Sequence, residues 1–285
     1  MPFCCFNNTF ISSEDFKVNS SNRSFRYGDG LFETIFVSNQ IPLFLPLHIQ
    51  RLVRGMKFLH MNFPSNWTID FFSNQIYELT KKNNYKNARC RITVWRGGEG
   101  YYLPNSNQPE LLIELTETEN EYYILNQTGL KLGLFGEVPK MMHPISAFKT
   151  AQAMPYVLAS LFAREQNFDD VVILNNEGRV ADATSSNIFI YRDRKLFTPA
   201  VGEGGVDGVT KKVIIALCLL EGIEVSETKI ESEDLLIADE IFLSNSINGI
   251  KWVESFQNKK YTNQFSTDLI FVLNEQKNNN TLVSP

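Results

Sequence analysis

The chain has 285 residues, 43% of them hydrophobic and 21% charged, and this ordinary globular composition allows one large domain or two of usual size. The formal net charge of -5 excludes a general basic field of the kind that binds nucleic acid. No apolar run approaches the roughly 18 residues needed to cross a bilayer, and the N-terminal MPFCCFNNTF lacks the features of a signal peptide. We therefore expect a cytoplasmic protein with neither a nucleic-acid nor a membrane partner.

The first part of the chain mixes strands with helices. Turn residues at 27–30 precede an alternating strand at 31–37 and a hairpin loop at 38–40. The apolar spacing then predicts two helices, at 47–61 and 67–82. β-branched residues in alternation predict two further strands, at 89–97 and 110–117. Thr68 is the candidate cap of the second helix. The polar stretch that follows predicts a smaller N-terminal domain over 1–118 and a linker over 119–128.

A larger C-terminal domain is expected over 129–285. The first predicted elements are a strand at 130–136, a helix at 153–166, a hairpin at 170–192 and a turn at 192–194. An acidic helix at 231–238 and a strand at 240–246 follow. The polar tail after 275 is expected to be frayed. Because strands and helices do not alternate regularly, the order predicts an α+β fold rather than a doubly wound sheet.

The glycine-rich segment GEGGVDG, at 202–208, leads directly into a predicted helix. Unpaired backbone N–H groups at a helix start carry positive partial charge and bind phosphate well. The segment lacks the lysine of a P-loop and the spacing of a dinucleotide fingerprint. Two interpretations remain open here, a phosphate-binding loop and a flexible joint.

Four cysteines and three histidines are spread without metal-ligand spacing, at 4, 5, 90 and 218 and at 48, 60 and 143. The pattern predicts reduced thiols and no metal site.

Four segments in fixed order resemble the class IV aminotransferase family, the pyridoxal-phosphate (PLP) enzymes of fold type IV. They are NRSFRYGDGLFET with HIQRL, SAFKTAQAMPYVLAS, EGRVADATSSNIF with LFTP and GVDGVT, and FLSNSINGIKWV. The family includes branched-chain and D-amino-acid aminotransferases and 4-amino-4-deoxychorismate lyases. The resemblance covers about residue 20 to 255 and implies a two-domain α+β fold with the cofactor at the domain interface. It also implies a homodimer.

The resemblance places the Schiff-base lysine at Lys149 and the phosphate-binding arginine at Arg51. Val209 and Thr210 match the pair whose N–H groups hold the phosphate, and Ser246 matches a hydroxyl on the same phosphate. A lysine with apolar neighbours loses its proton more easily, and a planar guanidinium suits a phosphate. Without the resemblance, Lys149 would be interpreted as a strand-end lysine, and Arg51 has the alternative of a solvated helix arginine.

Asp182 stands where the family pattern has a glutamate that pairs with the pyridine nitrogen. A carboxylate there keeps that nitrogen protonated, so the ring accepts electrons from the substrate. Asp182 is one methylene shorter, which predicts a longer, water-bridged or backbone-shifted contact. Gln152 and Lys211 are further departures, at positions where the family often has Asn and Arg.

The stretch RGGEGYY, at 96–102, bears on the reaction. It resembles the lyase branch but lacks a second arginine, and the arginine and histidine that trap a D-amino-acid carboxylate are absent. We expect 4-amino-4-deoxychorismate lyase-like activity on a small amino substrate, giving p-aminobenzoate and pyruvate. A branched-chain-type aminotransferase is the alternative, and a catalytically impaired binding homologue is a third. Arg96, Tyr27 and Tyr101 are candidate pocket residues, although the tyrosines could equally be core aromatics.

Overall fold

The computed structural model describes residues 1–276, so the predicted frayed tail lies almost wholly outside the described residues. The chain forms two compact units. The first unit comprises Met1–Tyr122 together with Phe148–Gln152, and the second comprises Tyr123–Ala147 together with the chain from Ala153 onward. The division after Tyr122 falls within the predicted linker. The short segment 148–152 differs from the prediction, which placed it in the C-terminal domain.

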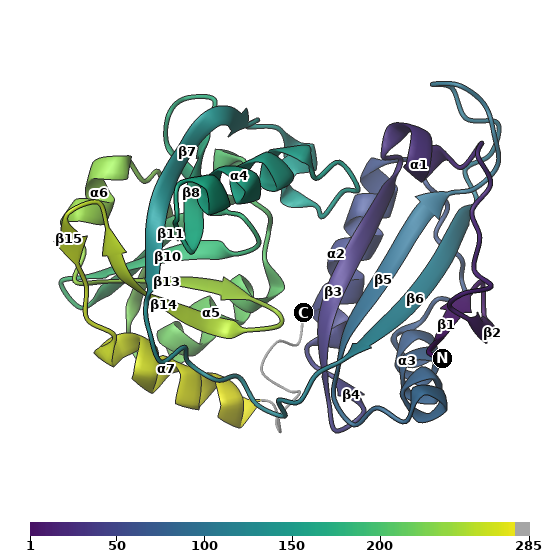
Figure 1. The fold of residues 1–285 in the computed structure, drawn as a ribbon, viewed down its shortest axis with the longest axis horizontal. Helices are drawn as coiled ribbons and strands as arrows, with labels where there is room; N and C mark the ends of the chain where they lie inside the picture. The colour runs from purple at the N-terminus through teal and green to yellow at the C-terminus, as the bar shows by residue number, and fades with distance from the viewer. Residues whose placement is uncertain (277–285) are drawn as a thin grey trace. The chain divides into compact units, whose positions relative to one another are not determined.

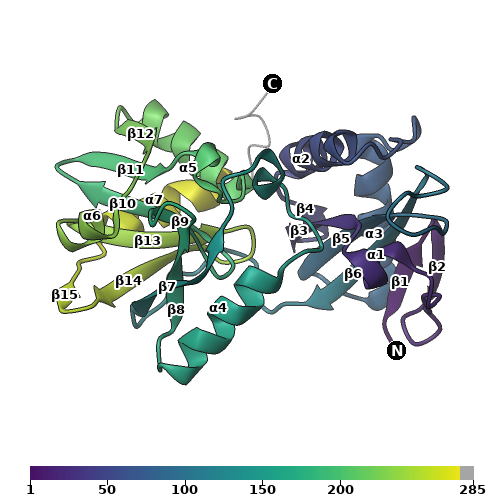
Figure 2. The same cartoon turned by 90° about the horizontal axis from the view of Figure 1, so that it is seen from above.

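The first unit is a six-stranded sheet with strand order β2-β1-β6-β5-β3-β4. Its strands are β1 (Phe3–Phe6), β2 (Thr9–Ser12), β3 (Gly30–Ser38), β4 (Ile41–Pro42), β5 (Ala88–Arg96) and β6 (Pro109–Glu117). Its helices are α1 (Arg23–Tyr27), α2 (Leu45–Phe58) and α3 (Ile69–Asn83), seen in Figures 1 and 2. The central strands and both long helices confirm the sequence-based prediction.

Alternation in β3 and β5 explains how this unit packs. Their inward residues form one apolar core with the stripes of α2 and α3, including Ile35, Val37, Cys90, Ile92, Leu52, Met56, Phe72 and Ile76. Thr68 caps α3, since its hydroxyl accepts a 3.1 Å hydrogen bond from the N–H of Phe71. The same alternation turns Glu33 toward α2, which places a carboxylate among apolar neighbours.

The second unit contains a nine-stranded sheet with path β12-β11-β10-β13-β14-β7-β8-β9, in which β15 pairs with β14. Its strands are β7 (Leu130–Lys140), β8 (Asp170–Asn175), β9 (Val180–Ala183), β10 (Asn187–Arg192), β11 (Lys195–Pro199), β12 (Glu224–Thr228), β13 (Glu240–Asn245), β14 (Gly249–Phe256) and β15 (Lys259–Lys260). Its helices are η1 (Pro144–Ala147), α4 (Met154–Glu165), η2 (Val201–Glu203), α5 (Val209–Leu220), α6 (Ser232–Leu236) and α7 (Gln264–Glu275). The pairs β7–β8, β7–β14 and β11–β12 are parallel and the others antiparallel.

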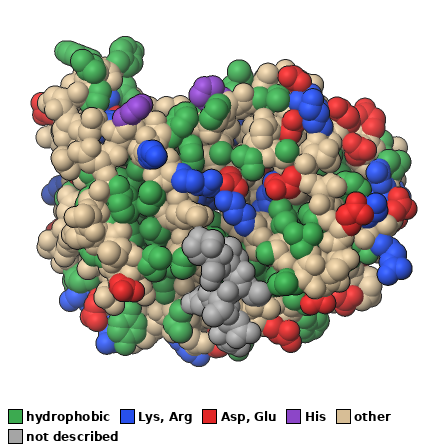
Figure 3. Space-filling model, turned by 180° about the vertical axis from the view of Figure 1, so that it is seen from behind, with side chains coloured by type: hydrophobic (Ala, Val, Ile, Leu, Met, Phe, Trp, Pro, Cys, Tyr) green, Lys and Arg blue, Asp and Glu red, His purple; other side chains and the backbone are tan. Residues whose placement is uncertain are grey.

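The helices of the second unit cover different parts of its curled sheet (Figure 2). Helix α4 packs on β7 and β8 through Ala159 and Ala163, while α5 and α7 pack on β12 to β14. The mixed order of helices and strands confirms the predicted α+β class. On the face drawn in Figure 3, acidic and basic side chains are interspersed, as the modest net charge leads one to expect.

Candidate functional site

The segment that carries Lys149 joins the first unit through its backbone. The N–H of Phe32 donates to the carbonyl of Lys149 at 2.8 Å, and the N–H of Ala151 donates to the carbonyl of Gly30 at 2.9 Å. Phe148 anchors the segment in the core, with its ring centroid 5.6 Å from that of Phe58. The Nζ of Lys149 lies 4.8 Å from the ring centroid of Phe32. The Lys149 amine thus lies near the start of β3, against an aromatic face.

Arg51 belongs to a buried charged cluster that links α2 to β3. Its Nε donates to Oε1 of Glu33 at 2.8 Å and its Nη2 donates to Oε2 at 2.5 Å, while Nδ1 of His48 lies 2.7 Å from Oε2. Burial raises the pKa of the Glu33 carboxyl, but Arg51 and His48 outweigh it and bring the pKa to about 2. Burial lowers the pKa of His48, and the charges of Arg51 and Lys149 add to that lowering against the opposing pull of Glu33. The cluster fixes the orientation of the Arg51 guanidinium.

Two cations share the ring of Phe32. Besides Lys149, the guanidinium of Arg91 from β5 lies 3.9 Å from its centroid, and its Nε donates to the hydroxyl of Thr93 at 3.2 Å. Burial of the Arg91 guanidinium lowers its pKa, with Arg89 adding to the effect. Sequence reasoning missed Glu33 and Arg91. Both are charged residues inside strands that alternate between apolar and polar side chains, and a charge at such a position could have marked them as candidates.

Asp182 lies on β9 in the second unit and is 2% exposed. Three donors hold its carboxylate: the hydroxyl of Tyr156 at 3.1 Å, Nδ2 of Asn187 at 3.2 Å and the N–H of Val206 at 3.1 Å. Buried carboxylates that accept several hydrogen bonds are favoured in the ionised form. Asp182 is therefore a buried strand residue and not a solvent-exposed turn residue.

The start of α5 has the features of a phosphate site. Its N-cap is Gly208, no side chain caps it, and Val209 and Thr210 behind it are each 2% exposed. The hydroxyl of Thr210 lies 3.4 Å from that of Ser246. A Cβ at Gly208 would lie 1.8 Å from Oδ1 of Asn187, so only glycine allows the Asn187 side chain to lie this close to the start of α5. Main-chain donors and two hydroxyls at a helix start fit a cofactor phosphate.

The loop before α5 is held by a second buried ion pair. Nε of Arg179 donates to Oε2 of Glu203 at 2.6 Å, and Nδ2 of Asn175 donates to the same carboxylate at 2.9 Å. Lys211 is a structural residue, since its amine donates to the carbonyl of Pro199 at 2.6 Å and pairs with Glu227 at 2.6 Å. The glycine-rich segment is therefore anchored, against the interpretation of a flexible joint.

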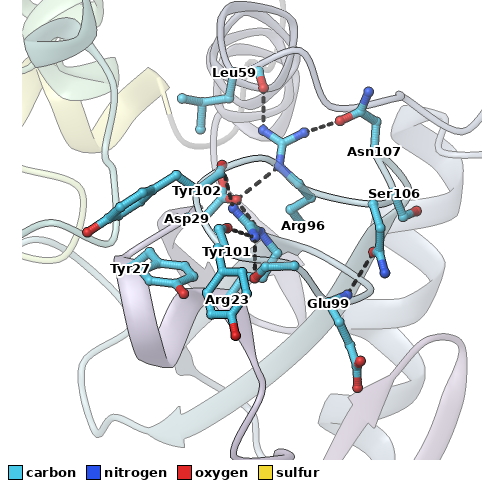
Figure 4. A network of polar contacts seen from close by, with 12 residues as sticks. Arg23, Tyr27, Asp29, Leu59, Arg96, Glu99, Tyr101, Tyr102, Ser106 and Asn107 are labelled. Carbon is cyan, nitrogen blue, oxygen red and sulfur yellow. Dashed lines mark hydrogen bonds and ion pairs between the residues drawn. The ribbon is translucent and has the colours of Figure 1, made fainter.

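The three candidate pocket residues lie in the network drawn in Figure 4. Nε of Arg96 donates to Asp29 at 2.9 Å, Nη1 to Asn107 at 2.5 Å and Nη2 to the carbonyl of Leu59 at 2.5 Å. Asp29 also accepts a 2.8 Å hydrogen bond from Arg23. In the first unit, Arg96 therefore supports the fold around Asp29.

The tyrosines of this network differ in exposure. Tyr101 is 82% exposed at the tip of its loop, and its carbonyl accepts a 2.5 Å hydrogen bond from Arg23. Tyr27 is partly buried, and its ring lies 5.6 Å from that of Tyr102. Neither tyrosine is a core aromatic. Gln152 approaches this region, with its Nε2 3.4 Å from the carbonyl of Tyr27.

Each unit thus brings together part of the predicted set. The first unit contains Lys149 and the Arg51 cluster, within range for the charge of Lys149 to act on His48, and the second unit gathers Asp182 with the donors around it and the start of α5 with Ser246. Among residues 1–276, no group of three or more His, Cys, Asp or Glu side chains could hold a metal ion. No helix in that range is long and apolar enough to span a bilayer.

The α+β fold and this donor set define a class of protein, the PLP-dependent enzymes of fold type IV. The chain belongs to the amino-transferase class IV family, whose profile matches residues 30–256. The predicted family, enzyme class and cofactor are therefore confirmed.

Related chains carry two different activities. An aminodeoxychorismate lyase of Bacillus subtilis is 27% identical over 253 residues, which are 85% of this chain and 82% of the relative. A branched-chain-amino-acid aminotransferase of Escherichia coli is 28% identical over 262 residues, 88% of this chain and 83% of the relative.

Among solved structures, the branched-chain aminotransferase of Thermoproteus uzoniensis with norvaline has a TM-score of 0.88 at 22% identity, covering 98% of this chain and 96% of the other. The T.th. branched-chain aminotransferase with pyridoxamine 5'-phosphate has a TM-score of 0.86 at 21% identity, covering 98% and 95%. These likenesses establish the shared fold.

Proposed function

We propose that this chain uses PLP, attached through Lys149, to break a bond at the amino-bearing carbon of a small substrate. The observation that carries the proposal is the placement of the Lys149 amine 4.8 Å from the ring centroid of Phe32, in the same unit as the Arg51 guanidinium that Glu33 orients. When bound, the cofactor supplies an aldehyde for the substrate amine and a ring that withdraws electrons from the substrate carbon.

The residues of the chain then have distinct roles. Arg51, the N–H groups of Val209 and Thr210, and the hydroxyl of Ser246 hold the phosphate. Asp182 accepts a hydrogen bond from the pyridine nitrogen and keeps it protonated. Once displaced by the substrate amine, Nζ of Lys149 takes a proton from the substrate carbon and returns it later.

Arg91 is the cation we assign to the substrate carboxylate. Its guanidinium lies on the same ring as the Lys149 amine, and an arginine side chain keeps its charge in proteins. Arg96 is less suited to this role because Asp29, Asn107 and Leu59 occupy its donors. It supports the Tyr101 loop instead.

For the reaction, we infer a lyase-like activity that forms p-aminobenzoate and pyruvate from 4-amino-4-deoxychorismate. The support is the stretch RGGEGYY, which resembles the lyase branch, together with the 27% identical lyase of Bacillus subtilis. Branched-chain-type amino transfer is the second candidate, favoured by the 28% identity to the Escherichia coli aminotransferase over 262 residues.

Absorbance spectroscopy and two product assays test these proposals. Purified protein mixed with PLP should develop visible absorbance that is absent in Lys149→Ala and retained in the control Lys131→Ala, a lysine exposed on β7. A wild-type chain that takes up no PLP would refute the assignment and favour a binding homologue. Formation of p-aminobenzoate then supports the lyase, and transfer of the amino group from a branched-chain amino acid to a keto acid supports the transaminase.

A homodimer is the assembly we propose. Helix α4 exposes apolar side chains at i, i+3, i+4 and i+7, namely Met154, Val157, Leu158 and Leu161, and such a stripe suits burial against a second copy. Light scattering on the eluted protein tests this, with a mass of one chain as the contrary result. All four cysteines are free thiols, which supports the cytoplasm as the compartment.

A further inference from the structure

Near Asp182 lies a buried lysine, Lys140, that has no role in the proposed function. Lys140 ends β7 and is 9% exposed. Its Nζ lies 4.3 Å from the ring centroid of Tyr156, on α4. In the part of the chain that the structure describes, this ammonium makes no hydrogen bond or ion pair, so the ring face is its principal contact.

Tyr156 connects this lysine to the carboxylate. Its hydroxyl donates to Oδ2 of Asp182 at 3.1 Å, the same oxygen that the N–H of Val206 reaches at 3.1 Å. Tyr156 on α4 thus contacts the Lys140 ammonium of β7 through its ring and the Asp182 carboxylate of β9 through its hydroxyl. Lys140 and Asp182 also interact directly through their charges, although burial is the larger influence and lowers the pKa of Lys140.

We propose that Lys140 and Tyr156 are positioning residues that keep Asp182 ionised and aimed toward its ligand. The inference rests on the proposed function in one respect, since the ligand of Asp182 is taken to be the pyridine nitrogen of PLP. The effect of Lys140 and Tyr156 on the Asp182 carboxylate does not depend on the cofactor.

Two physical effects support this arrangement. A hydrogen bond to a carboxylate favours its charged form, and the Tyr156 hydroxyl supplies one. A cation over an aromatic face is attracted by the ring and withdraws electron density from it, which makes the phenol a stronger donor. Both effects strengthen as the site is removed from water. An aspartate, with a shorter reach than the usual glutamate, gains from such support.

The groups that face Asp182 can be separated by substitution. Lys140 from β7 and Tyr156 from α4 are its titratable neighbours, and Asn187 and the N–H of Val206 are its neutral donors. Tyr156→Phe removes one hydroxyl and keeps the ring, while Lys140→Met removes the charge and keeps the length. Lys140→Arg restores the charge. The neutral donors remain in all three variants.

The first measurement follows the Asp182 carboxyl by carbon NMR in cofactor-free protein labelled at aspartate, with its signal assigned from Asp182→Asn. We expect the pH at which the carboxyl binds its proton to move upward in Tyr156→Phe and, by less, in Lys140→Met, with recovery in Lys140→Arg. Matched controls are Tyr191→Phe, whose ring stacks on Phe265, and Lys195→Met, whose exposed amine pairs with Glu224. These controls should leave the titration unchanged.

The second measurement is PLP retention, followed by the visible absorbance of the bound cofactor during dialysis. Loss of one hydrogen bond to a charged group should weaken retention about tenfold in Tyr156→Phe. An unmoved Asp182 titration in Tyr156→Phe overturns the proposal, as does unchanged PLP retention in that variant. An unmoved titration in Lys140→Met removes Lys140 from it. If the titrations move as expected while wild-type protein binds no PLP, the positioning inference is supported and the proposed function fails.

Discussion

Replacing Glu33 by glutamine tests the buried cluster that orients Arg51. The substituted amide keeps the size of the side chain but not its charge, so the Arg51 guanidinium, 4% exposed, loses its counter-ion. The Glu33 pKa falls from an ordinary 4.5 to about 2 on folding. A difference of that size corresponds to about 3 kcal/mol of stability at neutral pH, which agrees with the cost of removing one partner from a buried ion pair.

The sign of the pH dependence follows from the lowered pKa. Glu33 contributes stability that is fully present above pH 4.5, where the unfolded carboxyl is also ionised, and that is lost as the pH falls toward about 2. Of the total, about 2 kcal/mol disappears between pH 7 and pH 3. His48, whose pKa burial also lowers, contacts Glu33 and would respond to its loss, so both proteins carry His48→Asn, which removes this titration from their difference.

Urea unfolding monitored by tryptophan fluorescence measures this effect in the first unit alone. In a Trp252→Phe background, the remaining tryptophans, Trp67 and Trp95, both lie in that unit. We expect Glu33→Gln to be less stable by about 3 kcal/mol at pH 7 and by only about 1 kcal/mol at pH 3. The control Glu78→Gln, a half-exposed helix residue, should show no such convergence. Parallel stability curves for Glu33→Gln and its parent from pH 7 to pH 3 would refute the reasoning.

Three further substitutions test other parts of the structure. Gly208→Ala should displace Asn187 and reduce PLP retention at least tenfold, because the new Cβ would lie 1.8 Å from Oδ1 of Asn187; equal retention in dialysis would contradict the tight approach at α5. Thr68→Ala should lower the free energy of unfolding by about 1 kcal/mol through loss of the α3 cap, measured in urea, with Thr68→Ser expected to retain it. Arg23→Met should release the carbonyls of 100–102 and speed proteolytic cleavage there, and an unchanged digestion rate would argue against this anchor.

Local pattern was sufficient for the elements that bury one face. Strands β3 and β5 alternate, α2 and α3 carry apolar stripes, and all four were predictable. The hairpin of β1 and β2 was missed because each strand has only four residues and β1 gains its place by pairing with the distant β6. Helix α7 was also missed, although Leu269, Ile270 and Leu273 give it a helical apolar spacing.

The candidate site was predictable as residues but not as geometry. The order of motifs pointed to Lys149 and Asp182 as candidates, yet no local pattern could reveal that 148–152 pairs with β3 in the first unit. That pairing joins backbone groups far apart in the sequence. The same holds for Arg96, whose donors are occupied by Asp29 and Leu59, contacts that only the folded chain defines.

Asp182, which replaces the glutamate of the family pattern, lies next to a β-bulge in β9. The pairing of β8 with β9 shifts register between Ile173 and Leu174, so that Asp182 faces Ile173 while Val180 faces Leu174 and Ala181 is the extra residue. A bulge of this kind bends a strand and re-aims the neighbouring side chain. With three donors already on its carboxylate, Asp182 does not need the reach of a glutamate to be held in place. Asp182→Glu would have to displace those donors, so we expect the longer acid to lower PLP retention in this chain, and higher retention would show that reach is what the site lacks.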